Sequence, residues 1–437
     1  MGTIILSIAF IIEVGIAAYC IITKSNQKKF RSIIRIITLG SFIVFTLTSI
    51  LRWSFRWYGF TLLLFIWSIL GVWILIHNKE DKGEYKQGRI VRRAISAFIL
   101  IVLTLVPALV FPQYKLPKTT GNYKVESTVY TYTDINRIET FSNNNENRNV
   151  TVKFWFPQNA NDTYPLVVFS HGSFGIGMSN ESTYMELANN GYVVCSISHT
   201  YHSMYTMDTD HNIILVNAEF MKEVTDVNNG VYDEESIYEL FKKWEELRTS
   251  DINFVLDTII ENANSNDTDE VYHLINIDKI GVFGHSLGGS AVSAIARQRS
   301  DISAVVNLDA PLFGELIGFQ DGNMEMITSA YPVPLLNIYS DDLWEERNQW
   351  DTDFLYIPNF LLLSDTPADI YNVNFKGAKH LSFTDLPLVS PILSNILQGG
   401  KAKIDKYYCI ETMNSTILSF FDYYLKGVGS FNPAETY

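Results

Sequence analysis

The stretch KIGVFGHSLGGSAVSAIAR, residues 279–297, decides which fold we expect for this chain. It joins a short apolar segment, a glycine-rich turn centred on Ser286, and a run of small and apolar residues that suits a helix. A Gly-x-Ser-x-Gly motif alone is a weak signal in a chain of this length, whereas the same motif between a strand and a helix is a strong one. The stretch therefore predicts a strand, a sharp turn that presents the serine, and a helix.

The residue types of this turn have physical reasons. The turn holds Ser286 in a strained backbone conformation, and we expect side chains at positions 284 and 288 to collide with it, which the two glycines avoid. The turn also places Ser286 at the N-terminus of the next helix, where amide donors and the helix dipole favour a negatively charged oxygen. Ser286 is therefore the predicted nucleophile of an α/β-hydrolase fold.

Short apolar segments on both sides of the motif predict a mainly parallel sheet, because strands buried on both faces are continuously apolar. They are Leu166–Ser170, Tyr192–Ser198, Lys279–Phe283, Ser303–Leu308 and Pro334–Tyr339. Val125–Thr133 and Asn149–Phe156 alternate partially and predict a hairpin-like opening pair. Helical patterns at Trp244–Ala263, Gly289–Arg297 and Thr412–Leu425 predict helices on both faces of this sheet.

Two long polar and aromatic stretches interrupt this alternation, Tyr201–Leu240 and Asp342–Asp369. Loops of this length in a compact domain are usually lids or binding elements. A surface insertion without a role remains the alternative for both.

A nucleophilic serine needs a base and an acid, which follow it in the order acid, histidine along the chain of this fold. His380 is the only histidine after Ser286, so it is the predicted base. Two positions remain open for the acid. Asp309 ends the strand SAVVNLD, and Asp341 or Asp342 follows the next strand, which is the commoner position. A carboxylate at either strand end can orient an imidazole.

The oxyanion hole needs a second backbone amide besides that of Leu287. The segment SHGSFG, residues 170–175, directly follows a predicted strand, in the manner of the His-Gly loops of lipases and esterases. We place the second donor at Ser173, with Phe174 as the near alternative. His171 is expected to brace this loop rather than to transfer protons.

Six segments together resemble one known family. They are FSHGSFG at 169–175, SISHTYHS at 196–203, Arg248 with Asp251, GHSLGGSAV at 284–292, VVNLDAP at 305–311 and HLSFTD at 380–385. At these residues the sequence resembles the platelet-activating-factor acetylhydrolase family of lipases, in its plasma and type II intracellular branch. The resemblance covers roughly residues 125–425. It does not extend to the N-terminal region, and Pro311 stands where the family has a bulky residue.

The resemblance implies that the acid is Asp309, because the family takes it from the Leu-Asp-Ala segment after the serine motif. It also implies hydrolysis of short-acyl or oxidised-acyl esters, including phospholipid-like esters, without a metal or an organic cofactor. Two other classes of function remain open. One is a peptidase or acyltransferase that uses the same triad, and the other is a catalytically silent membrane sensor or scaffold.

Four apolar stretches precede this domain, each close to the roughly 20 residues that a membrane-spanning helix needs. They are Thr3–Thr23, Ile33–Leu51, Trp57–His77 and Ala94–Phe111. The sequence therefore predicts a four-span membrane region at 1–112, a Pro- and Gly-containing linker at 113–122 and an α/β-hydrolase domain at 123–437. Glu13 lies inside the first span, so it is either a functional group or the partner of a basic residue on another span.

Basic residues between the spans predict the orientation, because cytoplasmic joints are enriched in Lys and Arg. The first joint and its edge carry Lys24, Lys28, Lys29, Arg31 and Arg35, and the third carries Lys79, Lys82, Lys86, Arg89, Arg92 and Arg93. The short second joint has Arg52 and Arg56 among Trp53, Trp57 and Tyr58, which read as an interfacial aromatic belt. We expect both the N-terminus and the hydrolase domain on the extracellular side of the cell membrane.

Charge and cysteine content narrow the range of partners. Residues 1–118 carry a net charge of +11 and the remainder −25, so the acidic domain would repel a polyanion, and nucleic acid is not an expected partner. The expected partners are an ester substrate and the bilayer. Cys20, Cys195 and Cys409 form no C-x-x-C pair, so we expect three free thiols and no thiolate metal site.

Overall fold

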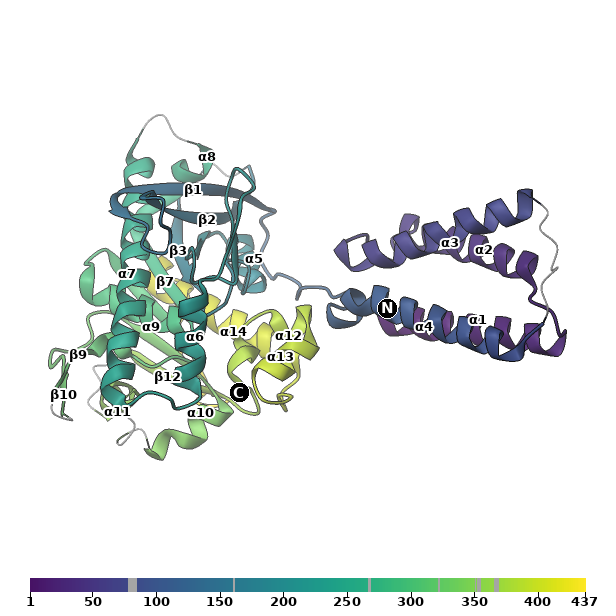
Figure 1. Ribbon diagram of the computed structural model, residues 1–437. Helices are drawn as coiled ribbons and strands as arrows, with labels where there is room; N and C mark the ends of the chain where they lie inside the picture. The colour runs from purple at the N-terminus through teal and green to yellow at the C-terminus, as the bar shows by residue number, and fades with distance from the viewer. Residues whose placement is uncertain are drawn as a thin grey trace. The chain divides into compact units, whose positions relative to one another are not determined.

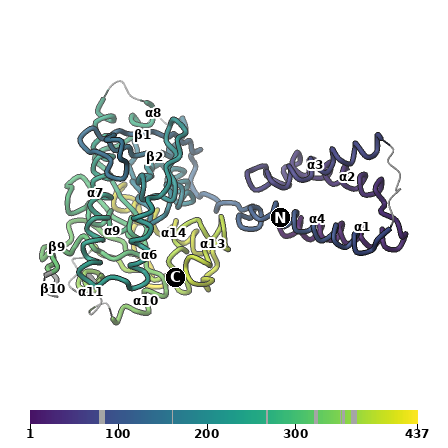
Figure 2. Tube along the Cα trace, in the orientation of Figure 1, coloured from purple at the N-terminus to yellow at the C-terminus, as the bar shows by residue number. Residues whose placement is uncertain are grey.

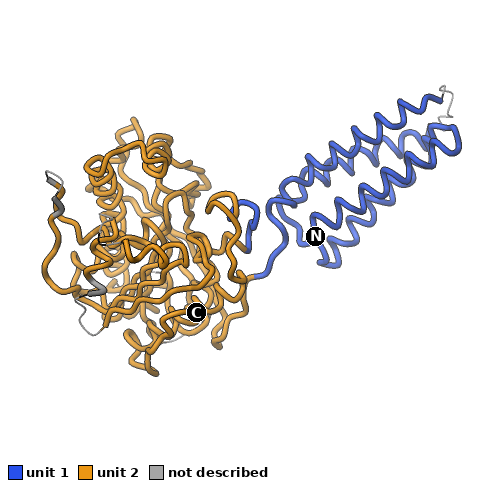
Figure 3. Tube along the Cα trace, turned by 90° about the horizontal axis from the view of Figure 1, so that it is seen from below, with its two compact units in different colours: residues 1–115, 388–394 blue, residues 116–387, 395–437 orange. Residues whose placement is uncertain are grey.

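The computed structural model describes residues 1–77, 85–159, 162–265, 269–320, 323–349, 351, 355–364 and 369–437. The chain divides into two compact units, shown in different colours in Figure 3. Unit 1 comprises residues 1–115 and 388–394, and unit 2 comprises residues 116–387 and 395–437. All three cysteines are buried and unpaired.

In unit 1, four helices of the described residues are long and apolar enough to cross a membrane. They are α1 (Gly2–Ile22), α2 (Lys28–Leu47), α3 (Tyr58–Ile76), which follows the 3₁₀ turn η1 (Phe55–Trp57), and α4 (Gln87–Val110). Helix α1 lies beside α4, and α2 lies beside α3 (Figure 1). The four predicted apolar helices are therefore present, although α2 begins five residues and α4 seven residues before the expected start.

Two expectations for this region need correction. Helices α2 and α4 begin well before their apolar stretches, so Lys28, Arg89 and Arg92 belong to helical turns rather than to joints. A helix can continue past its apolar stretch because its backbone bonds do not depend on side-chain polarity. Trp57 is 2% exposed and donates from Nε1 to the Arg52 carbonyl, so it cannot belong to an outward-facing aromatic belt. Lys79 and Lys82 lie outside the described residues.

The acid of the first span has a partner on the second. Glu13 is 4% exposed, and its Oε1 lies 2.5 Å from Arg35 Nη2. The Arg35 guanidinium also covers the ring of Trp67 at 3.5 Å. Of the two interpretations of Glu13, the structure favours an ion pair that holds neighbouring helices together.

Unit 2 is built on an eight-stranded sheet with the order β1-β2-β4-β3-β7-β8-β11-β12. The strands are β1 (Val125–Ile138), β2 (Asn147–Pro157), β3 (Tyr164–Ser170), β4 (Val193–Ser198), β7 (Ile275–His285), β8 (Ile302–Leu308), β11 (Leu335–Ser340) and β12 (Ile370–Phe375). Strands β1, β2 and β4 pair antiparallel, and every pair from β4 to β12 is parallel. This confirms the predicted α/β class.

Helices cover both faces of the sheet because its strands are apolar on both sides. In β3, Leu166 and Val168 belong to a core shared with α7 (Glu234–Asn264) and α9 (Leu287–Gln298). Val167 and Phe169 face the opposite core, shared with α5 (Glu181–Asn189) and α14 (Lys406–Phe421). Figures 1 and 2 show α7 and α9 side by side.

The parallel register brings the carboxyl ends of five strands to one edge of the sheet. Ser170 of β3 pairs with Gly284 of β7, and His285 pairs with Leu308 of β8. Leu308 pairs with Ile338 of β11, whose last residue lies opposite the end of β12. The segments that follow these strands carry the predicted site residues, so the fold gathers them at this edge.

The expected long loops contain secondary structure. The stretch 201–240 holds the hairpin β5 (Tyr205–Met207) and β6 (Ile213–Leu215), then α6 (Ala218–Asn228) and the start of α7. Helix α7 begins ten residues before the predicted Trp244 because Asp233 caps it, accepting from the Ser236 amide. The described part of 342–369 holds most of α10 (Asp341–Glu345), η3 (Glu346–Gln349) and α11 (Ile357–Ser364).

Helix α14 begins at Lys406, six residues before the expected start at Thr412, because Asp405 caps it. A π-helical turn, η5 (Asp422–Lys426), follows α14. The remaining elements are short. They are α8 (Glu270–His273), η2 (Phe313–Glu315), β9 (Leu316–Gln320), β10 (Asn323–Met326), η4 (His380–Phe383), α12 (Leu386–Val389) and α13 (Pro391–Leu397).

Candidate active site

Ser286 lies between β7 and α9, in the turn that the sequence predicts. Its backbone has φ 54° and ψ −130°, a conformation that costs a residue with a Cβ atom on the order of 1–3 kcal/mol. The Ser286 amide donates to the Leu308 carbonyl at 2.9 Å, which fixes the turn against the end of β8. The side chain is partly exposed, so Ser286 is strained, anchored and accessible.

The glycines of the turn are needed for a reason that differs from the expected one. A Cβ atom on Gly284 would lie 2.3 Å from the Gly288 carbonyl oxygen, and one on Gly288 would lie 2.1 Å from the Ser170 carbonyl oxygen. The obstacle is thus the backbone of the turn itself and of the end of β3, not the Ser286 side chain. Two backbones approach so closely here that only glycine fits.

Asp309 and His380 form a hydrogen bond, with 2.8 Å between Asp309 Oδ2 and His380 Nδ1. The second carboxylate oxygen accepts from the Ser340 amide at 2.6 Å. Because Nδ1 then carries a hydrogen, neutral His380 has an unprotonated Nε2. The His380 carbonyl accepts from His285 Nε2 at 2.9 Å, a contact that sequence reasoning missed although His285 is part of the motif.

Neither alternative acid contacts His380 in the described part of the chain. Asp341 Oδ1 has Asn374 Nδ2 at 3.5 Å, and Asp342 is exposed and pairs with Lys379 Nζ at 2.6 Å. The structure thus brings Asp309 to His380 and turns Asp341 and Asp342 elsewhere. Among the described contacts no hydrogen bond joins Ser286 Oγ to His380, as is common in catalytic sites without substrate.

The loop after β3 approaches the serine closely. A Cβ atom on Gly172 would lie 3.0 Å from Ser286 Cβ. The loop is a tight turn closed by the Gly175 amide, which donates to the Gly172 carbonyl at 3.1 Å, and Phe174 has φ 57° within it. Among the described residues the Ser173 amide has no protein acceptor.

The Leu287 amide is the other predicted oxyanion donor. It is the first amide of α9, and within the described part of the chain it donates to no protein group. Two free N–H groups, on the loop after β3 and at the start of α9, therefore lie on the elements that flank Ser286. Phe174, the alternative donor, is equally without a protein acceptor for its amide in this part of the structure.

A family model described as platelet-activating factor acetylhydrolase, isoform II, matches residues 141–433. The chain belongs to this family. The match leaves out the four apolar helices, as the sequence resemblance predicts.

Curated relatives in the family are distant in sequence. Platelet-activating factor acetylhydrolase of Bos taurus is 22% identical over 60% of this chain and 58% of its own length, and that of Gallus gallus is 24% identical over 60% and 63%. A probable 1-alkyl-2-acetylglycerophosphocholine esterase of Arthroderma benhamiae is 27% identical over 56% and 54%. The chain spans about six tenths of the length of these relatives. A ferulic acid esterase from Streptomyces cinnamoneus shares the fold, with TM-score 0.56 and 17% identity over 73% of this chain and 96% of that one.

In this acetylhydrolase-family domain, His171 braces the loop after β3. It is fully buried, its Nδ1 lies 2.7 Å from the Gly172 carbonyl, and its Nε2 lies 2.7 Å from Ser203 Oγ. Burial, assisted by the nearby Arg248 guanidinium, holds the pKa of His171 well below its ordinary value. A neutral and enclosed imidazole of this kind suits the bracing role that the sequence suggests.

A second serine, histidine and aspartate lie beneath this loop. His199 Nδ1 is 3.0 Å from Asp251 Oδ2, and His199 Nε2 is 2.9 Å from Ser170 Oγ. Arg148 donates to the same carboxylate from Nε at 2.6 Å and from Nη2 at 2.7 Å. All four residues are buried, and burial lowers the pKa of His199 to about 3. These four side chains are therefore enclosed, and they join β2, β3, α7 and the residue after β4.

An apolar cluster flanks Leu287. It contains Phe220 and Val224 of α6 and Trp244 of α7, with Phe174 packed against it. Phe220 stacks on His202 with ring centroids 3.7 Å apart. Helix α6 therefore packs beside the proposed oxyanion loop.

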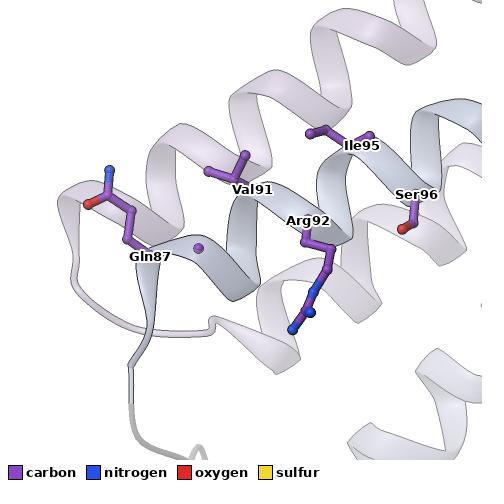
Figure 4. Close-up of a pocket in the computed structure, with 6 residues that line it drawn as sticks. Gln87, Val91, Arg92, Ile95 and Ser96 are labelled. Atoms are coloured by element: carbon purple, nitrogen blue, oxygen red, sulfur yellow. The ribbon is translucent and has the colours of Figure 1, made fainter.

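A shallow pocket of 490 Å³ lies in unit 1 and contains no predicted site residue. Gln87, Gly88, Val91, Arg92, Ile95 and Ser96 of α4 line it, and Figure 4 shows that they all come from this helix. No group of three or more His, Cys, Asp or Glu side chains among the described residues could hold a metal ion.

Proposed function

We propose that the chain is a membrane-tethered serine ester hydrolase with Ser286, His380 and Asp309 as its catalytic triad. The observation that carries this proposal is the Asp309–His380 hydrogen bond at the same sheet edge as a strained, accessible serine. Family membership and the esterase fold support an ester as the substrate. Neither the contacts of Asp341 nor those of Asp342 suit the role of the acid.

The proposed reaction begins when Ser286 Oγ attacks the ester carbonyl and His380 Nε2 takes the hydroxyl proton. The amides of Ser173 and Leu287 stabilise the oxyanion of the tetrahedral intermediate. His380 then gives the proton to the leaving alcohol, and an acyl-enzyme remains. Water, activated by the same imidazole, releases the acid and restores Ser286.

The proposed substrates are short-acyl or phospholipid-like esters. The relatives, which include a probable 1-alkyl-2-acetylglycerophosphocholine esterase, support this class. The partly buried apolar residues around Leu287, Phe174 among them, are the proposed contacts for an acyl or alkyl chain. Measuring release of acid from acetyl esters, peptides and thioesters, with and without added alcohol acceptors, separates the hydrolase from a peptidase or an acyltransferase.

A serine-directed fluorophosphonate tests the nucleophile and the silent-scaffold alternative together. We expect the full chain to be labelled and Ser286→Ala to remain unlabelled, because only an activated serine reacts readily with this probe. Heat-denatured wild type is the control for nonspecific labelling. Equal labelling of native wild type and Ser286→Ala would remove Ser286 from the mechanism, and no labelling of either would favour the scaffold.

We propose that both the N-terminus and unit 2 face the extracellular side. The support is the basic residues near the ends of α1, α2 and α4, together with four helices that return the chain to its starting side. Protease added to intact cells should then degrade unit 2. An epitope tag inserted at residue 83, between α3 and α4, should be protected until the cells are lysed. Protection of unit 2 in intact cells would reverse the orientation.

A further inference from the structure

Arg248 of α7 is a fully buried guanidinium without an ion-pair partner. Among the described residues, no carboxylate oxygen lies within 4.0 Å of it. Arg148 offers the contrast, because it is equally enclosed but is paired with both Asp251 and Glu139. An unpaired charge in a protein interior costs several kcal/mol, so the position of Arg248 requires a compensating interaction.

The hydrogen bonds of Arg248 go to the backbone of the loop after β3. Nη1 donates to the His171 carbonyl at 2.7 Å, and Nη2 lies 3.4 Å from the Gly172 carbonyl. The Gly172 carbonyl also accepts from His171 Nδ1 at 2.7 Å and from the Gly175 amide at 3.1 Å. Three donors, one of them cationic, therefore converge on a single carbonyl oxygen.

That carbonyl belongs to the same peptide unit as the Ser173 N–H. Donors at the oxygen of a peptide draw electron density away from its nitrogen, which makes the N–H a stronger donor. A fixed positive charge in a poorly polarisable interior also stabilises an anion held by that N–H. The Gly172–Ser173 peptide group thus lies between the charge of Arg248 and the proposed oxyanion position.

The guanidinium is both charged and fixed in place. Burial lowers the pKa of Arg248 to about 9, with Asp251 opposing this shift, so the side chain stays cationic at neutral pH. Its Nε lies 3.3 Å from His202 Nδ1, and the His202 ring is held flat against Phe220. Burial, with the charge of Arg248, keeps the pKa of His202 well below its ordinary value, so Nδ1 is free to accept.

We propose that Arg248 is a positioning residue that polarises the Gly172–Ser173 peptide and so strengthens the Ser173 amide as an oxyanion donor. The proposal rests on the proposed function, because it assigns a role within that reaction. A polarised oxyanion donor stabilises the transition state more than the bound ester, so this role predicts a loss of kcat that a purely structural role would not.

The test compares Arg248→Met and Arg248→Lys in the full chain purified in detergent. For p-nitrophenyl acetate we expect Arg248→Met to lower kcat by about 10²-fold, as loss of an oxyanion donor does, with KM within about threefold. Inhibition by phenylboronic acid, which forms a tetrahedral anionic adduct with an active serine, should weaken by a similar factor. Arg248→Lys should have a kcat about tenfold higher than that of Arg248→Met, because lysine keeps the positive charge but lacks the planar guanidinium with its several donors.

Arg148→Met is the matched control, because it removes a neighbouring buried arginine whose described bonds go to Asp251, Glu139 and the Thr200 carbonyl and not to the loop after β3. It should lower the unfolding midpoint while kcat and boronic acid affinity of the folded fraction stay within about threefold. If Arg248→Met does not fold, Arg248→Lys and His171→Gln take its place, since each weakens donation to the Gly172 carbonyl. For both we expect a fall in kcat of about tenfold at nearly constant KM.

Three outcomes overturn the inference. They are unchanged boronic acid affinity in the folded Arg248 variants, a lysine variant no better than the methionine variant, and equal kcat losses in Arg148→Met and Arg248→Met. Ser286→Ala keeps this failure distinct from failure of the proposed function. An inactive Ser286→Ala beside an Arg248→Met of normal kcat refutes the Arg248 role alone, whereas an active Ser286→Ala refutes both.

Discussion

Two aspartate–histidine pairs in unit 2 have nearly the same geometry and opposite surroundings. Asp309 and His380 are 2.8 Å apart, and the His380 side chain is 44% exposed. Asp251 and His199 are 3.0 Å apart, and both side chains are 0% exposed. A serine accompanies each pair, Ser286 on a strained turn and Ser170 at the end of a regular strand.

The two acids differ in whether a cation already balances their charge. The charge of Asp251 is already balanced by Arg148, and His199 is enclosed between its two partners. Among the described residues, Asp309 pairs with no cation except the imidazolium that would form on His380, and its other oxygen accepts from a neutral amide. An acid whose charge is uncommitted can stabilise a transient cation, whereas a paired acid cannot.

The two serines provide the largest expected contrast. Ser286→Ala should lower kcat for p-nitrophenyl acetate by about 10⁶-fold, as loss of a triad serine does. Ser170→Ala should keep kcat within about tenfold and cost about 1–3 kcal/mol of stability, the usual effect of an unpaired buried group, here His199 Nε2. Steady-state rates and urea unfolding of the two full-length variants measure both effects. More than about 1% residual activity in Ser286→Ala would refute the assignment.

The acids provide the next contrast. Asp309→Asn should lower kcat by about 10⁴-fold, because His380 would lose the partner that sets its tautomer and stabilises its charge. Asp341→Asn and Asp342→Asn serve as matched controls at the next strand end and should stay within about tenfold. Circular dichroism checks that all three fold. A crippled Asp341→Asn beside an active Asp309→Asn would exchange their roles.

Two buried acids of α7 provide the smallest contrast. Arg148 and His199 help to hold the pKa of Asp251 well below its ordinary value, in opposition to burial. Glu245 accepts a hydrogen bond from Ser290 Oγ, and burial raises its pKa from 4.5 to about 7. Folded protein thus binds the Glu245 proton more tightly than unfolded protein, and this stabilisation is present at low pH and lost as pH rises through about 7.

Glu245→Gln replaces the titrating carboxyl with an amide, so the free energy of unfolding should depend less on pH. The free energy of unfolding of the wild type, relative to Glu245→Gln, should fall by roughly 2 kcal/mol between pH 5 and pH 8. Urea unfolding of both proteins at several pH values, followed by tryptophan fluorescence, gives this difference. A pH-independent difference would mean that Glu245 remains ionised across the range.

Sequence reasoning found the elements whose pattern is strong. Strands β3, β8 and β11 and the second half of β7 are mostly apolar and buried, and the long apolar helices of unit 1 are equally plain. It missed the hairpin β5–β6, because strands of three residues are too short to show a period. Helix α6 was missed because only Phe220 and Val224 of its residues are buried.

The candidate site was also predictable only where the sequence carries a strong signal. The position of Ser286 follows from its motif, and His380 follows from being the only histidine downstream. The preference for Asp309 over Asp341 needed a family resemblance, because both end parallel strands and only the turn after each decides where the carboxylate points. The bond from His285 to the His380 carbonyl joins residues 95 apart, and nothing local in the sequence signals it.

Three non-glycine residues at the proposed site, Phe174, Ser286 and Asp309, have φ between 54° and 57°. Such a backbone conformation costs a residue with a Cβ atom on the order of 1–3 kcal/mol. A selection for heat resistance alone would therefore favour glycine at these positions, and Ser286→Gly should raise the melting temperature while it abolishes turnover. With Ser286 as the proposed nucleophile, the most stable form of this chain would then be an inactive one.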